Sequence, residues 1–322
     1  MPRVVILGTG GTIAGTGAGP NDTHYVAAQL SVEHLVRAVP ELAGAPLETQ
    51  QVAQIDSKDM DWLVWQALIL ALRSALSRPE VGAVVVTHGT DTLEETAYLL
   101  HRLLDIDKPV ILTAAMRPAT SAQADGPRNL RDAVLVAQEA AANRRAGVVA
   151  VMAGAVWAGH AVRKAHSWHI DAFDGGDNEP LGHITDSGEV RMQAAWPEPG
   201  RGGWSALQAQ RPPRVEIVTS HAGADGQVVE ALLAHASAQD ALMGLVVACT
   251  GHGTVHQGLS AALDRAEGQG VRVWRSTRVA RGGVQPRPGE RWPAAGSLTA
   301  AQARVALMLN LLGVAPPGGM KD

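Results

Sequence analysis

The chain has 322 residues, 46% of them hydrophobic, which is enough for one large domain or two ordinary domains with a substantial core. Its formal net charge of −4 gives no electrostatic reason to expect nucleic acid or an anionic membrane as a partner. No apolar run approaches the roughly 18 residues of a membrane span, so we expect a soluble protein.

The N-terminus favours a cytoplasmic location. A signal peptide carries an apolar stretch of about 7–15 residues, whereas glycines interrupt the sequence soon after Val4 to Leu7. We interpret these residues as a first strand and not as a leader. The single cysteine, Cys249, cannot form an internal disulfide, which also favours a reducing compartment.

Short apolar strands alternate with longer amphipathic helices in the first part of the chain. This pattern predicts an α/β fold with a mainly parallel sheet. Strands are expected at 4–7, 51–55, 81–86, 109–112 and 147–152. Helices are expected at 31–39, 60–76, 93–104 and 128–142.

The pattern changes between about residues 175 and 212, where Gly, Pro and Trp become frequent. We interpret this region as a short β-hairpin followed by an interdomain linker. Beyond it, strands are expected at 215–218, 244–247 and 271–273, and helices at 228–236, 256–266 and from 299 onward. We therefore predict a larger N-terminal α/β domain at 1–190, a linker at 191–213 and a smaller C-terminal α/β domain at 214–322.

A glycine-rich segment, Gly8 to Gly15, follows the first predicted strand, at the kind of loop where open α/β sheets bind ligands. A dinucleotide fingerprint would need glycine in place of Ile13, and no Lys–Ser/Thr pair is present to make a phosphate loop. The glycines still allow a tight turn whose N–H groups point at a ligand oxygen, and Thr12 adds a hydroxyl. Taken alone, the segment is best explained as a plain strand-to-loop turn.

A second polar segment, Thr87 to Glu95, follows the strand expected at 81–86. Its residues 90–92 are good N-cap types and its two glutamates suit a first helical turn, so a capped helix would explain it. The combination of Thr12, Thr90 and Lys164 favours chemistry instead. A threonine hydroxyl needs a group that takes its proton, and amide hydrolysis needs donors for the oxyanion. Spacing alone does not bring Lys164 close to either threonine.

Both segments resemble the two signature motifs of the bacterial-type L-asparaginase family, in the same order and at similar separation. Further similarity extends along most of the chain, at 55–60, 115–118, 124–130, 278–279 and the final helix. The resemblance implies an enzyme that hydrolyses L-asparagine to L-aspartate and ammonia. Its mechanism would be double displacement by a threonine nucleophile, with no cofactor and no metal.

The resemblance also implies roles for individual residues. Thr12 would be the primary nucleophile, on a mobile loop that closes over substrate, and Tyr25 would hydrogen-bond it and help to move its proton. In a second cluster, Thr90 would orient the water or the oxyanion, Lys164 would tune Thr90, and Asp91 would also hold the substrate ammonium. The remaining substrate contacts would be backbone at Gly11, Thr12 and Thr90 for the oxyanion, Ser57 for the α-carboxylate, and Ala114 for the leaving amide.

Some positions depart from the family pattern. Lys58 stands where many members carry a neutral or acidic side chain, so it either points away from substrate or alters the preference among amides. The resemblance further implies a homotetramer built from two intimate dimers, in which a neighbouring subunit supplies an asparagine and an acidic residue. Thr254 is the best match for the first and Glu290 for the second. The balance of asparaginase over glutaminase activity therefore stays open.

Two alternatives remain. A glutaminase-asparaginase of broad specificity would use the same residues with a roomier pocket. A non-catalytic amino-acid sensor would need Asp91 and Ser57, but it has no use for the two threonines together with Tyr25 and Lys164.

The histidines and the cysteine have simpler interpretations. The pairs His252/His256 and His166/His169 have helical spacing, but no metal-binding pattern accompanies them, so we expect surface or supporting roles. His88 is interpreted as structural, positioning the loop before Thr90. Cys249 is interpreted as a small buried side chain and not as a nucleophile.

Overall fold

The computed structural model describes residues 2–17, 24–200, 202–237 and 240–316. The chain divides into two compact units, residues 1–202 and residues 203–322. This boundary falls inside the segment 191–213 that was expected to be a linker. Each unit has its own sheet and its own buried core, and each is a mixed α/β structure, so the predicted fold class is confirmed.

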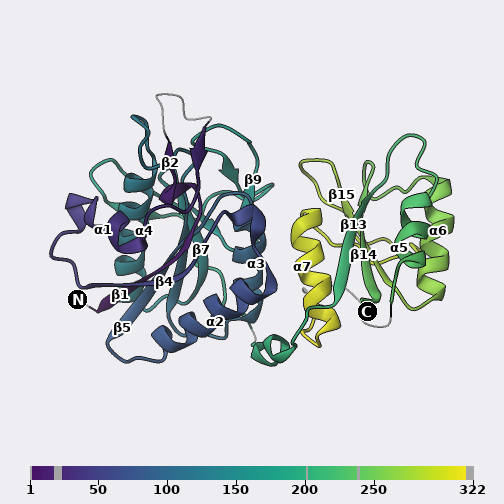
Figure 1. The fold of residues 1–322 in the computed structure, drawn as a ribbon, viewed down its shortest axis with the longest axis horizontal. Helices are drawn as coiled ribbons and strands as arrows, with labels where there is room; N and C mark the ends of the chain where they lie inside the picture. The colour runs from purple at the N-terminus through teal and green to yellow at the C-terminus, as the bar shows by residue number, and fades with distance from the viewer. Residues whose placement is uncertain (1, 18–23, 201, 238–239, 317–322) are drawn as a thin grey trace. The chain divides into compact units, whose positions relative to one another are not determined.

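The first unit is built on an eight-stranded sheet with the order β12-β11-β8-β7-β6-β5-β1-β4 (Figure 1). Its strands are β1 (Arg3–Gly10), β4 (Leu47–Ile55), β5 (Val81–Thr87), β6 (Pro109–Thr113), β7 (Gly147–Met152), β8 (Ala155–Ala158), β11 (Gly182–Ile184) and β12 (Val190–Met192). The strands from β4 through β1, β5 and β6 to β7 are parallel, and the strands beyond β7 are antiparallel. The expected hairpin is β11–β12, which extends this sheet.

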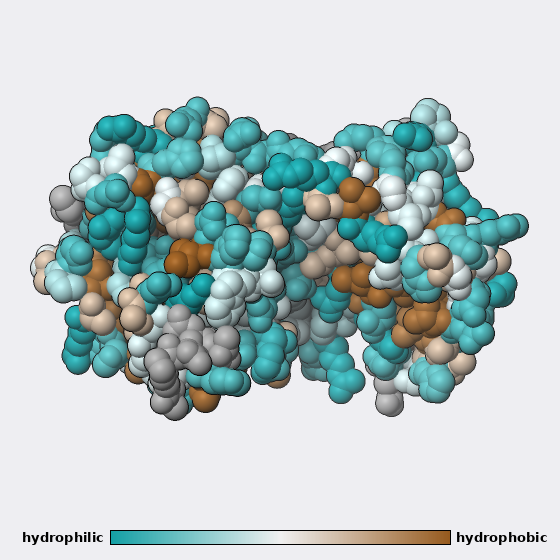
Figure 2. Space-filling view, turned by 90° about the horizontal axis from the view of Figure 1, so that it is seen from above, coloured by the Kyte–Doolittle hydropathy of each residue, from teal (hydrophilic) through white to brown (hydrophobic). Residues whose placement is uncertain are grey.

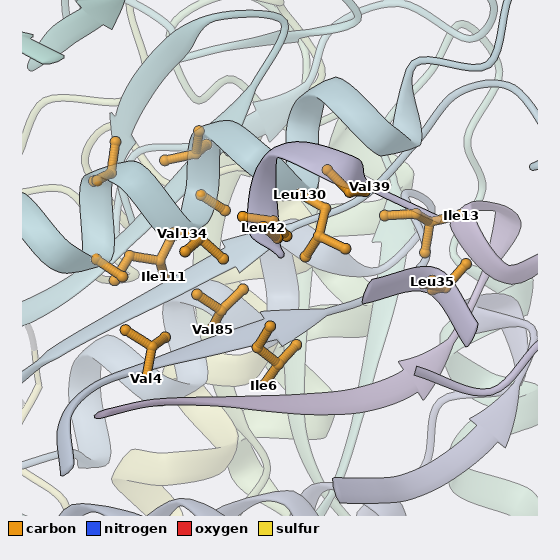
Figure 3. Close-up of a cluster of buried hydrophobic side chains, with 14 of the residues drawn as sticks. Val4, Ile6, Ile13, Leu35, Val39, Leu42, Val85, Ile111, Leu130 and Val134 are labelled. Atoms are coloured by element: carbon orange, nitrogen blue, oxygen red, sulfur yellow. The ribbon is translucent and has the colours of Figure 1, made fainter. Parts of the chain in front are cut away.

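Helices cover both faces of the parallel strands. They are α1 (Val32–Arg37), α2 (Trp62–Leu76), α3 (Leu93–Leu103) and α4 (Gly126–Ala142). On the face covered by α1 and α4, the inward side chains of β1, β5 and β6 pack against helix residues such as Leu130 and Val134 (Figure 3). Because both faces are covered, the central strands are almost entirely apolar, as the β-branched run in β5 predicts.

Element boundaries differ from the sequence-based expectation where local chemistry intervenes. Helix α1 ends at Arg37, two residues early, because Val39 precedes Pro40 and takes an extended conformation there. Ser31 caps this helix as expected, accepting a hydrogen bond from the His34 N–H. Strand β4 begins at Leu47, four residues before the predicted start, because its polar first half pairs with β1 from Val4 onward.

The second unit has a three-stranded parallel sheet with the order β13-β14-β15. Its strands are β13 (Arg214–Thr219), β14 (Leu242–Cys249) and β15 (Arg272–Thr277), and its helices are α5 (Gln227–Ala234), α6 (Gln257–Gly268) and α7 (Ala300–Leu311). Helix α7 packs against the sheet and begins with the predicted capping box, in which Thr299 and Gln302 exchange hydrogen bonds.

On the face shown in Figure 2, hydrophilic side chains surround smaller groups of hydrophobic ones. Within the described part of the chain, no helix is both long and apolar enough to cross a membrane.

Candidate active site

The topology of the large sheet singles out the gap between β1 and β5. After β1 the chain moves to β4 on one side, and after β5 it moves to β6 on the other side, so the direction of winding reverses between these two strands. Open α/β sheets bind ligands at such a switch point, beyond the carboxyl ends of the strands. The two glycine- and threonine-containing segments follow β1 and β5, and both therefore lie at this position.

A glycine pair brings the two loops into backbone contact. Gly11 has φ +81°, and a Cβ added to it would lie 2.3 Å from the Cα of Gly89. A Cβ on Gly89 would lie 2.4 Å from Oγ of Ser57, in the loop after β4. Only glycine fits at both positions, so three loops from three neighbouring strands meet here. Sequence reasoning missed the part played by Gly89, although its place between His88 and Thr90 was visible.

The first reactive group is Thr12, in a short 3₁₀ turn, Thr12–Ala14, directly after β1. Thr12 is 7% exposed, and its hydroxyl lies 2.8 Å from the hydroxyl of Tyr25. Tyr25 belongs to β3 (Tyr25–Val26), which pairs with β2 (Thr16–Gly17). The connecting residues 18–23, part of the loop expected to close over substrate, lie outside the described residues. The structure thus brings together the predicted pair of hydroxyls.

The second reactive group is formed by Thr90, Asp91 and Lys164. Nζ of Lys164 donates to Oγ1 of Thr90 at 2.9 Å and to Oδ1 of Asp91 at 2.7 Å. Thr90 is 5% exposed, whereas Asp91 is exposed to solvent. Lys164 comes from β9 (Arg163–Lys164), more than 70 residues further along the chain. The fold therefore supplies the proximity that spacing alone left open.

Ser57 connects the loop after β4 to the start of α3. Its hydroxyl accepts a hydrogen bond from the Asp91 N–H at 3.2 Å, and its carbonyl accepts one from the Thr92 hydroxyl at 2.8 Å. The neighbouring Lys58 pairs with carboxylates of its own loop, at 2.5 Å from Asp59 and 3.6 Å from Asp56. Lys58 therefore forms its ion pairs within this loop.

The backbone of Gly11 is already engaged. Its N–H donates to the Ile55 carbonyl at 2.8 Å, and its carbonyl accepts from the N–H groups of Ala14 and Ala28. The expected oxyanion contact from Gly11 therefore has a competing partner within the protein. What Gly11 contributes in this structure is the close approach to Gly89.

Ala114 follows β6 and is fully buried. Its carbonyl accepts a hydrogen bond from the side chain of Asn129 at 2.9 Å, and the same amide group donates to Asp125. The Asp125 carboxylate also accepts the N–H groups of Met116 and Arg117, while burial raises its pKa. The motif at 124–130 was recognised from the sequence. That its side chains hydrogen-bond to the main chain of the segment after β6 could be found only from the structure.

His88 directly follows β5, two residues before Thr90, and is completely buried. Its Nδ1 lies 2.7 Å from the Gly89 carbonyl, which can only accept, so Nδ1 carries the proton. Nε2 then accepts from the hydroxyl of Thr96, which itself accepts from Nε1 of Trp65. Burial lowers the pKa of His88 to about 4. A neutral ring that is hydrogen-bonded at both nitrogens agrees with the structural role expected for His88.

The other histidines do not assemble a metal site. Among the described residues, no group of three or more His, Cys, Asp or Glu side chains could hold a metal ion. Neither pair shares a helix face: His166 and His169 stack on each other between β9 and β10 (Phe173–Asp174), and His256 is the N-cap of α6. Cys249 is buried at the end of β14, and burial raises its pKa to about 12.

The two residues matched to a neighbouring subunit's contribution both belong to the second unit. The Thr254 hydroxyl donates to the Thr250 carbonyl and lies 2.8 Å from the Thr250 hydroxyl. Glu290 forms an ion pair with the buried Arg275, which lowers the pKa of the Glu290 carboxyl. Both side chains therefore have partners within the described chain.

Comparison with known proteins agrees with this geometry. The family model "Asparaginase, N-terminal" matches residues 3–197, and "Glutaminase/Asparaginase C-terminal domain" matches residues 214–314. The chain belongs to the asparaginase family. Within the family, it is 36% identical over 324 residues to L-asparaginase 2 of Escherichia coli (strain K12), covering 97% of this chain and 89% of the relative.

Two further members of the asparaginase family are similar along nearly the whole chain. A glutaminase-asparaginase of Pseudomonas fluorescens biotype A is 34% identical over 333 residues, covering 97% of this chain and 86% of the relative. The crystal structure of a probable cytoplasmic L-asparaginase from Campylobacter jejuni superposes with a TM-score of 0.88 at 34% identity, covering 97% of this chain and 95% of the other.

Proposed function

We propose that this chain is an L-asparaginase that hydrolyses L-asparagine to L-aspartate and ammonia. The observation that carries the proposal is the meeting of two hydroxyl clusters, Thr12–Tyr25 and Thr90–Lys164–Asp91, through the contact of Gly11 with Gly89. A protein that only binds an amino acid would have no use for two separately hydrogen-bonded threonines. Membership of the asparaginase family supports the same conclusion.

In the proposed first step, Oγ1 of Thr12 attacks the side-chain amide carbon of asparagine. Tyr25, 2.8 Å from that oxygen, relays the proton: its phenolic oxygen accepts the Thr12 proton as its own O–H proton passes to the leaving nitrogen. Backbone N–H groups of Thr12 and Thr90 hold the oxyanion, and the Ala114 carbonyl accepts from the amide nitrogen. Ammonia leaves, and an aspartyl ester remains on Thr12.

In the second step, water attacks the ester carbon. Thr90, hydrogen-bonded to Lys164, orients this water, and the collapse of the second tetrahedral intermediate returns the proton to Thr12 and releases aspartate. The substrate ammonium is held by the exposed carboxylate of Asp91 and the substrate α-carboxylate by Ser57. One amide and one water are consumed, and one carboxylate and one ammonium are produced. No step requires a cofactor.

The decisive experiment is ammonia release from the purified chain with L-asparagine, L-glutamine and D-asparagine in parallel, with and without a chelator. We expect release from L-asparagine that a chelator does not alter. Absence of release from all three, with amino-acid binding still detectable, would contradict the proposal and favour the sensor.

A glutaminase-asparaginase of broad specificity is the second candidate. The observation that favours it is the similarity to the Pseudomonas fluorescens relative of that name. The two candidates share every residue of the proposed mechanism, so the ratio of kcat/KM for L-glutamine and L-asparagine separates them. A ratio near one would establish the broader activity.

We further propose that the chain works as a homotetramer in the cytoplasm, with a neighbouring subunit completing each site. The resemblance to a probable cytoplasmic family member supports the location. Light scattering of the purified protein tests the assembly, since a monomer would contradict it, and cell fractionation tests the location.

A further inference from the structure

Lys164 lies on one of the shortest strands of the first unit. Strand β9 has two residues and pairs only with β10 within the described sheets, in a two-stranded ladder separate from the eight-stranded sheet. The main-chain hydrogen bonds of the eight-stranded sheet, which position the segments carrying Thr12 and Thr90, therefore do not include the main chain of Lys164. The lysine side chain is long and flexible. Its ammonium therefore stays close to Thr90 only if the main chain at Lys164 has a fixed position.

The first turn of α3 provides such a hold. Oε2 of Glu94 accepts a hydrogen bond from the main-chain N–H of Lys164 at 2.9 Å, across 70 residues of sequence. The same short segment, from Thr90 to Glu94, also receives the Lys164 ammonium through Thr90 and Asp91. Main chain and side chain of one lysine are thus both bonded to one helix start.

We propose that Glu94 is a positioning residue, which holds the main chain of Lys164 so that its ammonium lies against Thr90. An acidic residue in a first helical turn ordinarily needs no explanation beyond the helix dipole. Here the carboxylate reaches another strand instead and makes a charge-assisted hydrogen bond, which is stronger than a neutral one. The consequence of this bond for turnover rests on the proposed function, whereas its effect on Lys164 does not.

Two conservative variants separate the bond from the charge. Glu94→Gln keeps the length and a carbonyl acceptor but removes the charge, whereas Glu94→Asp keeps the charge but is one methylene too short. The hydrogen bond to the Lys164 N–H requires an acceptor on a side chain as long as that of glutamate. We therefore expect Glu94→Gln to retain turnover within about threefold. Because small misplacements of catalytic groups are costly, we expect Glu94→Asp to lower kcat about tenfold or more with little change in KM. Glu95→Ala, which removes an acidic charge from the same helical turn, serves as the control and should remain near the unmodified value.

A second readout does not depend on amide hydrolysis. The chain has only four lysines, Lys58, Lys108, Lys164 and Lys321, so peptide mapping after brief acylation reports the reactivity of each amine. Lys108, whose amine donates to two main-chain carbonyls, is the internal reference. We expect the acylation rate of Lys164 relative to Lys108 to rise several-fold in Glu94→Asp and to stay unchanged in Glu94→Gln and Glu95→Ala.

The outcomes are distinct. Equal damage by Glu94→Gln and Glu94→Asp, or unchanged Lys164 reactivity in Glu94→Asp, would overturn the role of Glu94. In a Lys164→Met background, Glu94→Asp should cost no further turnover, and a further loss of the same size would also overturn it. If the unmodified chain releases no ammonia from any amide, the proposed function fails, and the acylation rates still decide whether Glu94 holds Lys164.

Discussion

At the scale of single residues, the candidate site contains two threonine hydroxyls with different partners. The Thr12 hydroxyl faces a phenol, which can both accept and return a proton. The Thr90 hydroxyl faces an ammonium that also pairs with a carboxylate. This difference agrees with the proposal that Thr12 is the nucleophile and that Thr90 has the supporting role.

Removing the Thr12 hydroxyl should therefore be more damaging than removing its partner. We expect Thr12→Val to lower kcat by about a thousandfold or more, since the nucleophile is lost, and Tyr25→Phe to lower it by roughly a hundredfold, the range of one proton-transfer group. Thr16→Val, in the same hairpin, is the matched control. Steady-state ammonia release with L-asparagine measures all three, and near-normal turnover in Thr12→Val would exclude it as the nucleophile.

Thr12, Thr90 and Lys164 were identifiable as candidates from residue type and motif, and Tyr25 from the family resemblance. Their supporting contacts were not. Glu94 and Asn129 contact residues 70 and 15 positions away, and only the strand order determines which of the distant loops meet. The preference of glutamate for the first turn of a helix was enough to explain Glu94 locally, so nothing in the sequence indicated a distant partner.

At the scale of elements, the site is a meeting of loops after three parallel strands. The closest approach is between Gly11 and Gly89, where any side chain would displace a neighbouring loop. Strands β1 and β5 tolerate little movement, because their side chains are buried on both faces. A steric insertion at this point must therefore displace the loops that carry the reactive groups.

Gly89→Ala tests this contact. Its new methyl group would lie 2.4 Å from Oγ of Ser57, so we expect turnover to fall by at least about a hundredfold. Gly268→Ala, at a helical position where nothing lies within 4 Å, is the matched control and should slightly stabilise the fold. Circular dichroism and ammonia release are measured on both. A fully active Gly89→Ala variant would contradict the close approach of the loops.

Element types were predictable along most of the chain, because hydrophobic periodicity separates buried strands from amphipathic helices. Two kinds of detail were not. Helix α1 is shortened by the restriction that Pro40 places on Val39, and the polar half of β4 is a strand only because β1 lies beside it. The histidine pairs show that helical spacing alone does not make a helix.

At the scale of the whole molecule, His88 connects site geometry to stability. The ring is buried and neutral, held between Gly89 after β5 and Thr96 on α3. Its pKa of about 4 lies below the ordinary value of 6.5, so the unfolded chain binds the extra proton first as the pH falls. The stabilisation is complete above about pH 6.5 and is lost progressively towards pH 4, by up to about 3 kcal/mol.

His88→Gln removes this titration. We expect the free energy of unfolding in urea to fall between pH 7.5 and pH 4.5 by less in the variant than in the unmodified chain. His183→Gln, which changes an exposed histidine, should leave the pH dependence unaltered. Identical pH dependence in all three proteins would mean that His88 does not titrate as a buried group.

The division into two α/β units could also be anticipated from the sequence, because the Gly- and Pro-rich region interrupts the alternation of strands and helices. What the sequence did not reveal was how each unit uses its own polar residues. Glu290, considered for a contact with another subunit, pairs with Arg275 of its own unit. Such ion pairs depend on which residues the fold brings together, and no local sequence pattern specifies this.

The proposal that Thr12 is the nucleophile is tested most directly by locating the covalent intermediate. The purified protein is mixed with saturating L-asparagine, quenched in acid within milliseconds, digested and mapped by mass spectrometry. We expect an aspartyl ester on the peptide that contains Thr12, and no modification of the peptide that contains Thr90. An ester on Thr90, or ammonia release with no acylated peptide during turnover, would contradict the assignment of Thr12 as the nucleophile.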